Sequence, residues 1–383
     1  MDFGLGRRLA SHSPAENIIL DGALVGRLRA DLEDLFEVID IATPRQAQQG
    51  VIVFTGRLLM NDADRAYEVL AGRWARHEYT PLLRKSRGQQ QVIGQPGLVK
   101  PRPSNPWINL VLFLTTVITV LLMGALNEGA NPLQDPASIV AGIHFAFTLL
   151  AILGTHEFGH YFAARRHGVA VTLPYFIPMP LSFVGTFGAF IQLRSPVRNR
   201  NQLFDVGVAG PLAGLVVALP LLVYGLAMSP VQPLPSTETY MLEGNSLLYL
   251  ATKYLVHGQI LPGNGLDVML HPMAFAAWFG VLVTAFNLLP VGQLDGGHVV
   301  FTLIGDKIRL VGSLFVALLL VMGLALWQGW VVWAMLIFLL GVGHPPPLND
   351  LTPLDARRKL LAMLVFLIFA LVFVPIPLQV VTP

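Results

Sequence analysis

The chain has 383 residues, of which 54% are hydrophobic and 13% are charged, and its formal net charge is +2. Soluble domains carry roughly 25% charged residues, so this composition and a mean hydropathy of +0.61 exclude a purely soluble protein and favour a membrane protein. The small net charge gives no indication of nucleic acid as a partner, and none is expected. Because cysteine is absent, any metal must be held by His, Asp or Glu.

The N-terminal quarter of the chain differs in composition from the rest. Residues 1–103 hold 14 of the 25 Lys and Arg residues and no apolar run long enough to span a membrane. The first 22 residues also lack the apolar segment of a signal peptide, so we expect an N-terminus that is not exported. We therefore predict a soluble cytoplasmic α+β domain over residues 1–103, followed by a proline-rich linker to about residue 106.

Local patterns predict the elements of this domain. The β-branched and aromatic residues over 50–60 are typical of a strand. Asn61 and Asp62 then favour the start of a helix, because short polar side chains cap helix N-termini. The other expected elements are a helical segment at 24–38 and two strands, at 79–83 and 90–93, joined by a turn at 85–88.

Beyond the linker, apolar runs predict a membrane-embedded domain over residues 107–383. A membrane-spanning helix needs roughly 20 apolar residues. The predicted fold class is mainly α: a polytopic membrane protein with about seven transmembrane helices, a re-entrant hairpin and a small soluble α+β N-terminal domain. The predicted spans are 107–126, 137–165, 206–228, 271–289, 310–327, 329–341 and 358–375.

The distribution of basic residues predicts the orientation of these spans. With the N-terminus inside, the cytoplasmic segments would carry 24 Lys and Arg, and the outer segments only Lys253. The short loops outside the N-terminal domain alone divide ten to one. Cytoplasmic loops are enriched in basic residues. We therefore predict a multi-pass protein of the inner or plasma membrane, with its N-terminus in the cytoplasm and its C-terminus outside.

Two segments are predicted to be neither spans nor ordinary loops. Residues 171–194 are apolar but interrupted by proline and glycine, and they begin and end on the cytoplasmic side. Non-helical backbone at membrane depth is tolerated where it is buried in protein or lines a wet cavity, so we predict a re-entrant hairpin. Residues 230–270 are predicted to form an outer loop with a short interfacial helix at 247–256.

The sequence HEFGH at 156–160 lies inside the second predicted span. On a helix, His156 and His160 are one turn apart on one face, where two imidazoles can bind one zinc ion. Glu157 lies beside them, placed to take a proton from a water molecule that the metal activates. Because ionisable side chains are costly inside a membrane span, the motif predicts water-activating chemistry within the membrane.

A catalytic zinc site needs a third protein ligand and an open position, and Asp295 is the candidate for that ligand. The fourth predicted span ends on the cytoplasmic side, at a depth similar to that of HEFGH. Pro290 is expected to end that helix. Gly296 and Gly297 are expected to allow the turn that brings Asp295 back toward the metal.

HEFGH followed by NLLPVGQLDGG at 287–297 resembles the site-two protease family of intramembrane zinc metalloproteases, whose pattern is HExxH with NxxPxxxxDG. The resemblance covers roughly residues 107–345. GTFGAFIQLRSP, RNQLFDVGVAGPLAG and GHPPP further resemble the branch with a soluble N-terminal domain, found in cyanobacteria, other bacteria and plant chloroplasts. One position departs from the family, since Gly214 stands where many members have Asn.

The resemblance implies an enzyme that hydrolyses peptide bonds in or near transmembrane segments, with a catalytic core at about 137–300. It implies Zn²⁺ held by His156, His160 and Asp295. Glu157 would be the general base, and Asn287 would position substrate or stabilise the developing oxyanion. The implied partners are the lipid bilayer and membrane-protein substrates, in particular single-span ones.

Alternative functions are weighed against this one. A zinc-binding but proteolytically silent membrane scaffold, regulator or transporter would not need the intact Glu157. A membrane metalloprotease of the prenyl-protein type takes a glutamate ligand from a later helix, and lipid desaturases need several histidine clusters; the sequence shows neither pattern. If the chain is a protease, we expect the hairpin segment 183–191 to pair with an extended substrate.

Four further polar residues are interpreted as structural first. His298 is expected beside the site rather than as a fourth ligand, and His344 at a rigid loop end before three prolines. His144 lies three helical turns before His156, too far to bind the same metal. Asp205 is expected to favour a helix N-terminus, with a contact to substrate or hairpin left open.

Overall fold

The computed structural model describes residues 22–43, 50–101, 103–235 and 239–382. The described chain divides into two compact units. The first combines the N-terminal region before residue 102 with two later segments, Arg194–Phe204 and Pro345–Arg358. The second contains Pro103–Leu193, Asp205–His344 and the chain from Lys359 onward.

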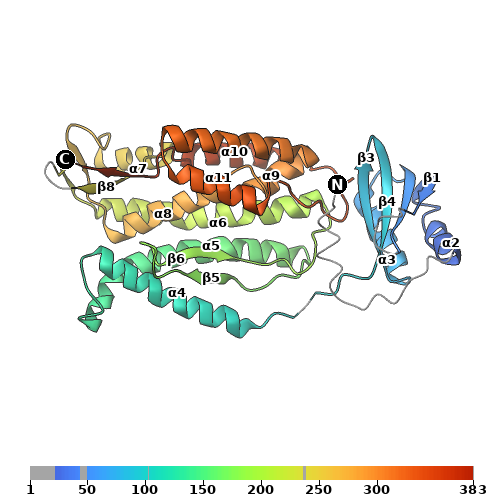
Figure 1. Ribbon diagram of the computed structural model, residues 1–383, viewed down its shortest axis with the longest axis horizontal. Coiled ribbons are helices and arrows are strands. Elements are labelled where there is room, and N and C mark those ends of the chain that lie inside the picture. Colours follow the sequence, from blue (N-terminus) through green and yellow to red (C-terminus); the bar gives the residue numbers. More distant parts are fainter. Residues whose placement is uncertain (1–21, 44–49, 102, 236–238, 383) are drawn as a thin grey trace. The chain divides into compact units, whose positions relative to one another are not determined.

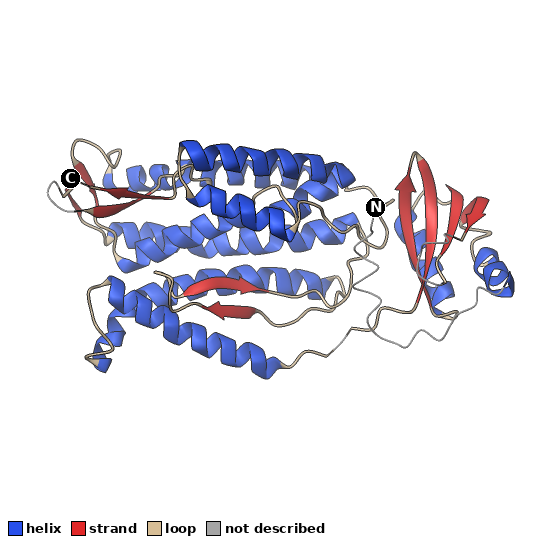
Figure 2. Ribbon diagram, viewed as in Figure 1, coloured by secondary structure: helices blue, strands red, loops and turns tan. Residues whose placement is uncertain are grey.

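An antiparallel four-stranded sheet forms the centre of the first unit (Figures 1 and 2). The elements in chain order are α2 (Gly22–Ala30), β1 (Phe36–Ala42), β2 (Ile52–Leu58), α3 (Ala63–Ala75), β3 (Tyr79–Ser86) and β4 (Gln89–Pro96). The strands lie side by side in the order β1-β2-β4-β3, which makes β2 and β4 the central pair.

Helix α3 begins where the sequence predicts. The Asp62 side chain accepts hydrogen bonds from the backbone amides of Asp64 (2.9 Å) and Arg65 (3.1 Å), which would otherwise lack partners at a helix N-terminus. One face of the helix is buried in the core of the unit through Leu70 and Trp74. The N-terminal turns of α3 carry the acidic residues Asp64 and Glu68.

The prediction of a helical segment at 24–38 is only partly right. Helix α2 ends at Ala30, and the chain from Phe36 forms β1, which pairs antiparallel with β2. In this segment, FEVIDIA, the β-branched residues Val38, Ile39 and Ile41 favour a strand, and the pairing with β2 shifts register between Val38 and Asp40. Pairing with β2 also satisfies the backbone hydrogen-bonding groups of this segment. The partner strand cannot be identified from the residues of the segment alone. The other three predicted strands are observed as β2, β3 and β4.

Helices dominate the second unit (Figure 1). They are α4 (Pro106–Asn127), α5 (Ile143–Arg166), α6 (Arg200–Ala227), α8 (Pro272–Asn287), α9 (Asp295–Ile304), α10 (Ile308–Ala325), α11 (Gly329–Leu340) and α12 (Ala356–Val372). The first turns of α6 and α12 belong to the first unit, so these two helices continue from one unit into the other.

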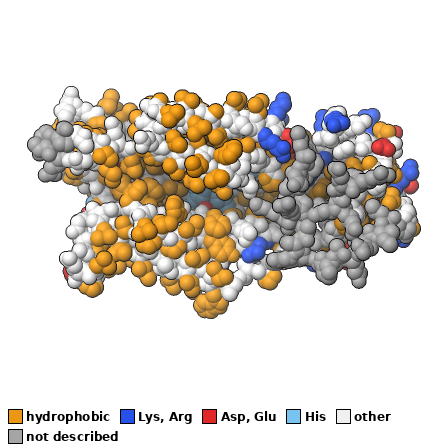
Figure 3. All heavy atoms as spheres, viewed as in Figure 1, with side chains coloured by type: hydrophobic (Ala, Val, Ile, Leu, Met, Phe, Trp, Pro, Cys, Tyr) orange, Lys and Arg blue, Asp and Glu red, His pale blue; other side chains and the backbone are white. Residues whose placement is uncertain are grey.

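Within the described residues, four helical stretches are long and apolar enough to cross a membrane: Pro106–Asn127, Pro136–Arg166, Arg200–Ala227 and Asp295–Ala325. The apolar helices α8 and α11 are shorter. Each of the seven predicted ranges contains a helix, while the number of spans stays a prediction. Figure 3 shows apolar side chains spread over the helical face of this unit, and residues such as Leu324 are 87% exposed. The protein is therefore a membrane protein, mainly α in its fold.

Glycines allow the helices of the second unit to approach closely. A Cβ at Gly159 of α5 would lie 2.6 Å from the Ala209 carbonyl oxygen of α6. A Cβ at Gly225 of α6 would lie 2.5 Å from the Ala274 amide of α8. Small residues therefore bring α5, α6 and α8 together, as in other membrane helix pairs.

A two-stranded hairpin occupies the segment predicted to be re-entrant. Strands β5 (Tyr175–Pro178) and β6 (Thr186–Phe190) pair antiparallel and run beside α4 and α5 (Figure 2). The Thr119 hydroxyl of α4 donates to the Gly185 carbonyl at 2.7 Å, and Asn127 donates to that of Phe183 at 2.9 Å. These bonds fix the hairpin tip to α4, and its depth in the membrane stays a prediction.

A small layer outside the long apolar helices completes the second unit. It contains α7 (Leu247–His257), as predicted for 247–256, and the strands β7 (Val231–Pro233), β8 (Tyr240–Glu243), β9 (Leu266–Val268) and β10 (Leu378–Val381). Lys253 of α7 is fully buried, with its Nζ atom 3.4 Å from an Asp267 oxygen and 3.7 Å from a Glu243 oxygen. One buried cation thus neutralises part of the charge of two buried carboxylates.

Candidate metal centre

Helix α5 places the two motif histidines on one face. The Nε2 atoms of His156 and His160 are 3.2 Å apart, and both side chains are buried. This spacing follows directly from their separation by four residues, because residues one turn apart on a helix point in the same direction. The motif therefore forms a two-nitrogen cluster inside the membrane domain, as the sequence predicts.

Asp295 joins this cluster from a different helix. Its carboxylate oxygens lie 3.2 Å from the His156 Nε2 atom and 3.4 Å from the His160 Nε2 atom. It is the first residue of α9, and the loop of seven residues after α8 returns it to α5. The structure thus brings together the three residues that were predicted as metal ligands.

The glycines around Asp295 act differently from the prediction. Gly296 and Gly297 are needed for close approach, because a Cβ there would lie 2.0 Å from the Leu288 carbonyl oxygen and 2.4 Å from that of Gly292, respectively. The residue with a left-handed backbone is Gly292, with φ of 56°. The turn is therefore made at Gly292, before Asp295, and the later pair lets α9 pack on the loop.

The donor atoms suit a zinc ion. Tetrahedral zinc with ligand bonds of about 2.0–2.2 Å holds its ligand atoms roughly 3.3–3.5 Å apart. The three separations among His156, His160 and Asp295 are 3.2, 3.2 and 3.4 Å. Two imidazoles and one carboxylate also match the nitrogen and oxygen ligands of catalytic zinc sites. We conclude that these residues fit the metal in both spacing and chemistry.

Helix α6 forms the wall behind the second histidine. The Nδ1 atom of His160 lies 2.7 Å from the Val206 carbonyl oxygen. A carbonyl oxygen only accepts, so Nδ1 carries the hydrogen and the Nε2 lone pair faces the metal position. A Cβ at Gly210 would lie 2.1 Å from the His160 Nε2 atom, and one at Gly214 would lie 3.3 Å from the His156 ring. The positions of the two histidine rings therefore require α6 to pass close to them.

Glu157 and Asn287 border the cluster. Glu157 is buried. One of its carboxylate oxygens and one ring nitrogen from each motif histidine all lie within 4.8 Å of one another. The backbone of Ile191, just after β6, lies near this carboxylate. The Asn287 amide nitrogen, at the end of α8, lies 3.3 Å from the His156 Nε2 atom. Both polar groups are thus close enough to contact a substrate at the metal.

Glu157 and Asp295 could each supply a carboxylate to the metal, and geometry distinguishes them. Asp295 is within hydrogen-bonding distance of both imidazoles, whereas Glu157 is placed in a looser group with them. Direct ligands of one zinc ion must lie roughly 3.3–3.5 Å from each other. Of the two carboxylates, Asp295 therefore has the closer contacts to both imidazoles.

The other polar candidates form pairs away from the two motif histidines. The His298 Nδ1 atom contacts the His344 Nε2 atom at 2.5 Å, and His344 stacks on Phe301. Asp205 contacts the His167 ring at 2.8 Å. No sequence pattern predicts the His298–His344 pair, because the two residues are 46 positions apart and belong to no shared motif.

His144 likewise lies apart from the metal ligands. Its ring packs edge to face against that of His271, with centroids 5.3 Å apart. The packing role expected for His144 fits this contact, and its partner comes from the N-terminus of α8.

A cavity of about 320 Å³ lies elsewhere in the second unit. Its lining includes Phe183 at the hairpin tip together with Glu243 and Asp267 of the small layer outside the long apolar helices, and none of the proposed metal ligands. Because chemistry is determined by reactive groups and not by cavity volume, we place the candidate site at the buried His and Asp cluster. Figure 3 shows pale blue histidine atoms in a hollow of the otherwise apolar helical face.

Comparison with known proteins agrees with this centre. Residues 144–327 match the family described as "Peptidase family M50". "Probable zinc metalloprotease EGY2, chloroplastic" from Oryza sativa subsp. indica is 33% identical over 269 residues, covering 69% of this chain and 49% of the relative. "Probable zinc metalloprotease EGY1, chloroplastic" from Arabidopsis thaliana is 29% identical over 306 residues, covering 72% and 55%. No solved structure matches the chain.

The chain therefore belongs to peptidase family M50, the site-two protease family, in the branch that includes these plant chloroplast relatives. This is a family of zinc metalloproteases, and zinc is the metal that the centre implies. The chain spans about half the length of these relatives.

Proposed function

We propose that this protein is an intramembrane zinc metalloprotease that hydrolyses peptide bonds in or near transmembrane segments of membrane proteins. The observation that carries the proposal is the spacing of His156, His160 and Asp295, with Glu157 beside them, inside an apolar helical unit. Ionisable groups in such surroundings are costly and usually functional. Membership of peptidase family M50 supports the same chemistry.

The proposed mechanism assigns a separate task to each residue. His156, His160 and Asp295 would hold zinc, which when bound acts as a Lewis acid on the substrate carbonyl and activates water. Glu157 accepts a proton from the attacking water and passes it to the leaving amine. Asn287 donates a hydrogen bond that orients the peptide or stabilises the charge developing on its oxygen.

The hairpin supplies a surface on which a substrate can be extended. A helical substrate keeps its peptide groups in its own hydrogen bonds, so it must unwind before hydrolysis. Strand β6 pairs with β5 on one side, and Phe187 is 69% exposed. Ile191, directly after β6, lies near Glu157. We infer that an unwound segment pairs along β6 and is thereby led toward the base, a mode of recognition known from other sheet edges.

The proposed setting follows the sequence. We propose an inner or plasma membrane location, a cytoplasmic N-terminus and an outer C-terminus, from the ten-to-one division of basic residues in the short loops. Single-span membrane proteins in the lipid bilayer are the proposed substrates.

The test is zinc stoichiometry and cleavage of a single-span reporter by purified protein, wild type against Glu157→Gln. We expect one zinc in both proteins and cleavage by the wild type alone, because the variant keeps the ligands and lacks the base. Equal behaviour of both proteins on all reporters would favour a silent zinc-binding scaffold. Absence of zinc from the wild type would overturn the site.

A further inference from the structure

Two segments of the first unit lead directly to the metal centre. Arg194–Phe204 includes the first turn of α6, and Pro345–Arg358 begins immediately after His344. Helix α6 carries the Val206 carbonyl that binds His160, and His344 binds His298. A displacement of either segment is therefore transmitted through the chain to side chains in or near the centre.

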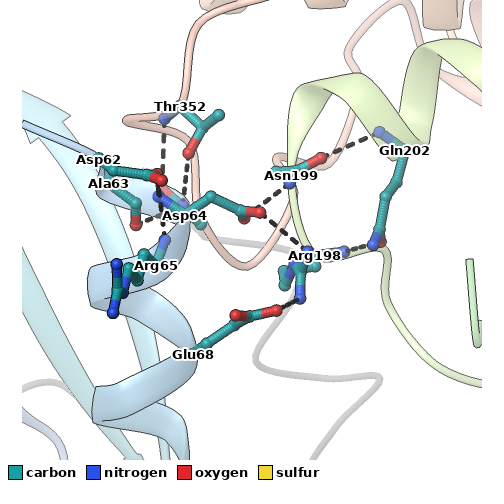
Figure 4. A network of polar contacts seen from close by, with 10 residues as sticks. Asp62, Ala63, Asp64, Arg65, Glu68, Arg198, Asn199, Gln202 and Thr352 are labelled. Carbon is teal, nitrogen blue, oxygen red and sulfur yellow. Dashed lines mark hydrogen bonds and ion pairs between the residues drawn. The ribbon is translucent and has the colours of Figure 1, made fainter.

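Helix α3 of the N-terminal domain contacts the first of these segments through charged and polar groups (Figure 4). Arg198 forms an ion pair with Asp64 at 2.8 Å and another with Glu68. The Asn199 amide nitrogen donates to the Asp64 carboxylate at 2.7 Å. Asp64 thus binds two consecutive residues at the start of α6.

Asn199 has a second partner within α6 itself. Its side-chain oxygen accepts a hydrogen bond from the backbone amide of Gln202 at 2.9 Å, and the Gln202 side chain accepts one from the Arg198 amide at 3.0 Å. The Asn199 side chain therefore caps α6 with its oxygen while its nitrogen binds α3 (Figure 4). One residue joins the N-terminal domain to the helix that backs the metal centre.

The second segment extends the sheet of the same domain. The Leu83 amide of β3 donates to the Leu348 carbonyl at 2.9 Å, and the Asp350 amide donates to the Leu83 carbonyl at 3.0 Å. Asn349, which lies between Leu348 and Asp350 in the sequence, is fully buried. Its side-chain amide donates a hydrogen bond to the Ala63 carbonyl at 3.0 Å. Pairing at a sheet edge in this way fixes the register of the segment that follows His344.

The two segments are also joined to each other. Arg200 forms an ion pair with Asp350 at 2.9 Å. From Asn199, α6 reaches Val206 after seven residues, about 10 Å at the helical rise of 1.5 Å per residue. An α-helix is stiff over two turns, so the position of its cap determines where that carbonyl lies.

The ion pairs between α3 and Arg198 are of a kind that can break and re-form. The side chains of Arg198, Asp64 and Glu68 are 31%, 27% and 57% exposed. Ion pairs of this exposure contribute little to folding stability and are weakened by salt. The two ion pairs of Arg198 can therefore separate without unfolding the domain, whose own core is apolar.

We propose that the N-terminal domain controls the metal centre through this contact, with Asn199 as the positioning residue. Docking of α3 on Asn199 holds the start of α6 so that the Val206 carbonyl orients His160 for the metal. Release of α3 loosens His160, speeds loss of zinc and lowers the rate of cleavage. The inference rests on the proposed function and specifies the regulation of the same site.

The test uses the full-length protein in detergent, loaded with zinc, and measures zinc release to a chelator together with kcat and KM for reporter cleavage. Asn199→Ser keeps a good helix cap but removes the donor to Asp64. Asp64→Ala removes the acceptor from the other side, and Asp64→Asn restores an acceptor for Asn199. Asp34→Ala is the matched control, because it breaks an ion pair with Arg73 within the same domain.

We expect zinc release about tenfold faster in Asn199→Ser and Asp64→Ala, in the range seen when groups that orient metal ligands are removed. In these two variants kcat falls while KM is unchanged, whereas Asp64→Asn and Asp34→Ala behave like the wild type. Wild-type zinc release in Asn199→Ser and Asp64→Ala would overturn the inference. Equal acceleration in Asp34→Ala would also overturn it, because general loosening of the domain would then suffice.

Zinc release separates failure of this inference from failure of the proposed function. If the wild type binds zinc but cleaves no reporter, the release rates still decide whether α3 acts on the centre. If the wild type binds no zinc, both proposals are wrong.

Discussion

Two polar clusters of this molecule show how surroundings determine what charged side chains do. In the second unit His156, His160 and Asp295 are gathered among apolar helices and largely withdrawn from water. In the first unit Asp64, Glu68 and Arg198 are partly exposed. Removing one group from the buried cluster should therefore have large effects on zinc binding and cleavage. The reason is that the remaining polar groups lose their partner in a medium of low dielectric constant. Removing an ion pair from the exposed cluster should change the unfolding free energy only a little, and in a salt-dependent way.

The largest effect is expected for Asp295→Ala, which removes the only carboxylate in hydrogen-bonding contact with both motif histidines among the described residues. We expect zinc to be lost and reporter cleavage to fall more than about 10³-fold, because a two-ligand site does not retain zinc. Metal analysis after gel filtration, with a cleavage assay, provides the measurement. Asp306→Ala, at an exposed position after α9, is the control; zinc retained in Asp295→Ala would contradict the assignment.

A third cluster sharpens the comparison, because it is buried but has no assigned chemistry. Lys253→Met leaves Glu243 and Asp267 buried without their cation, so we expect a loss of about 3–5 kcal/mol in unfolding free energy. Thermal unfolding in detergent measures it. Zinc content per folded molecule should be unchanged. A loss of zinc at full stability would show that this cluster is coupled to the metal centre.

The same variant should respond to pH in a defined direction. Burial raises the pKa of the Glu243 carboxyl, and Lys253 lowers it again in part. Without Lys253 the folded-state pKa rises further above the unfolded value, so the folded state binds more protons and stability falls as pH increases through that interval. The destabilisation of Lys253→Met should therefore be smaller at pH 5 than at pH 8. Equal destabilisation at both values would contradict this account.

A smaller effect is expected at the wall of the metal centre. In Gly210→Ala the new methyl group would lie 2.1 Å from the His160 Nε2 atom, so α6 or the imidazole must move. We expect zinc affinity to fall about 10–100-fold, as for other changes that misorient a ligand. Gly154→Ala on α5 is the control, because its methyl group meets the nearest atom at 4.0 Å. Chelator competition measures both, and equal affinities would contradict the proposed role of α6.

The smallest effect is expected at the exposed cluster. Glu68→Ala removes one of the two ion pairs of Arg198, and we expect a loss of at most about 1 kcal/mol in unfolding free energy at low salt. The loss should disappear in about 1 M salt, where the Debye length is near 3 Å. A salt-independent loss would show that Glu68 acts through packing instead of charge.

Local sequence was sufficient for the motif chemistry. Residues four apart on a helix share a face, so HEFGH alone placed His156 and His160 together, and the resemblance to the site-two proteases implied Asp295 as their partner. Apolar length likewise predicted seven helices of the second unit, but not α9, since burial in lipid requires backbone hydrogen bonds within the helix. Asp62 marked the start of α3 for an equally local reason, the need to cap the first amides.

Tertiary structure decided the features that depend on partners far along the chain. It made the segment from Phe36 a strand by pairing it with β2, and it set Val206 behind His160 and His344 against His298. It also joined Arg194–Phe204 and Pro345–Arg358 to the N-terminal domain. The physical reason is that hydrogen-bond partners and close helix contacts are chosen in space among many compatible groups, whereas periodicity and motif spacing are properties of neighbouring residues.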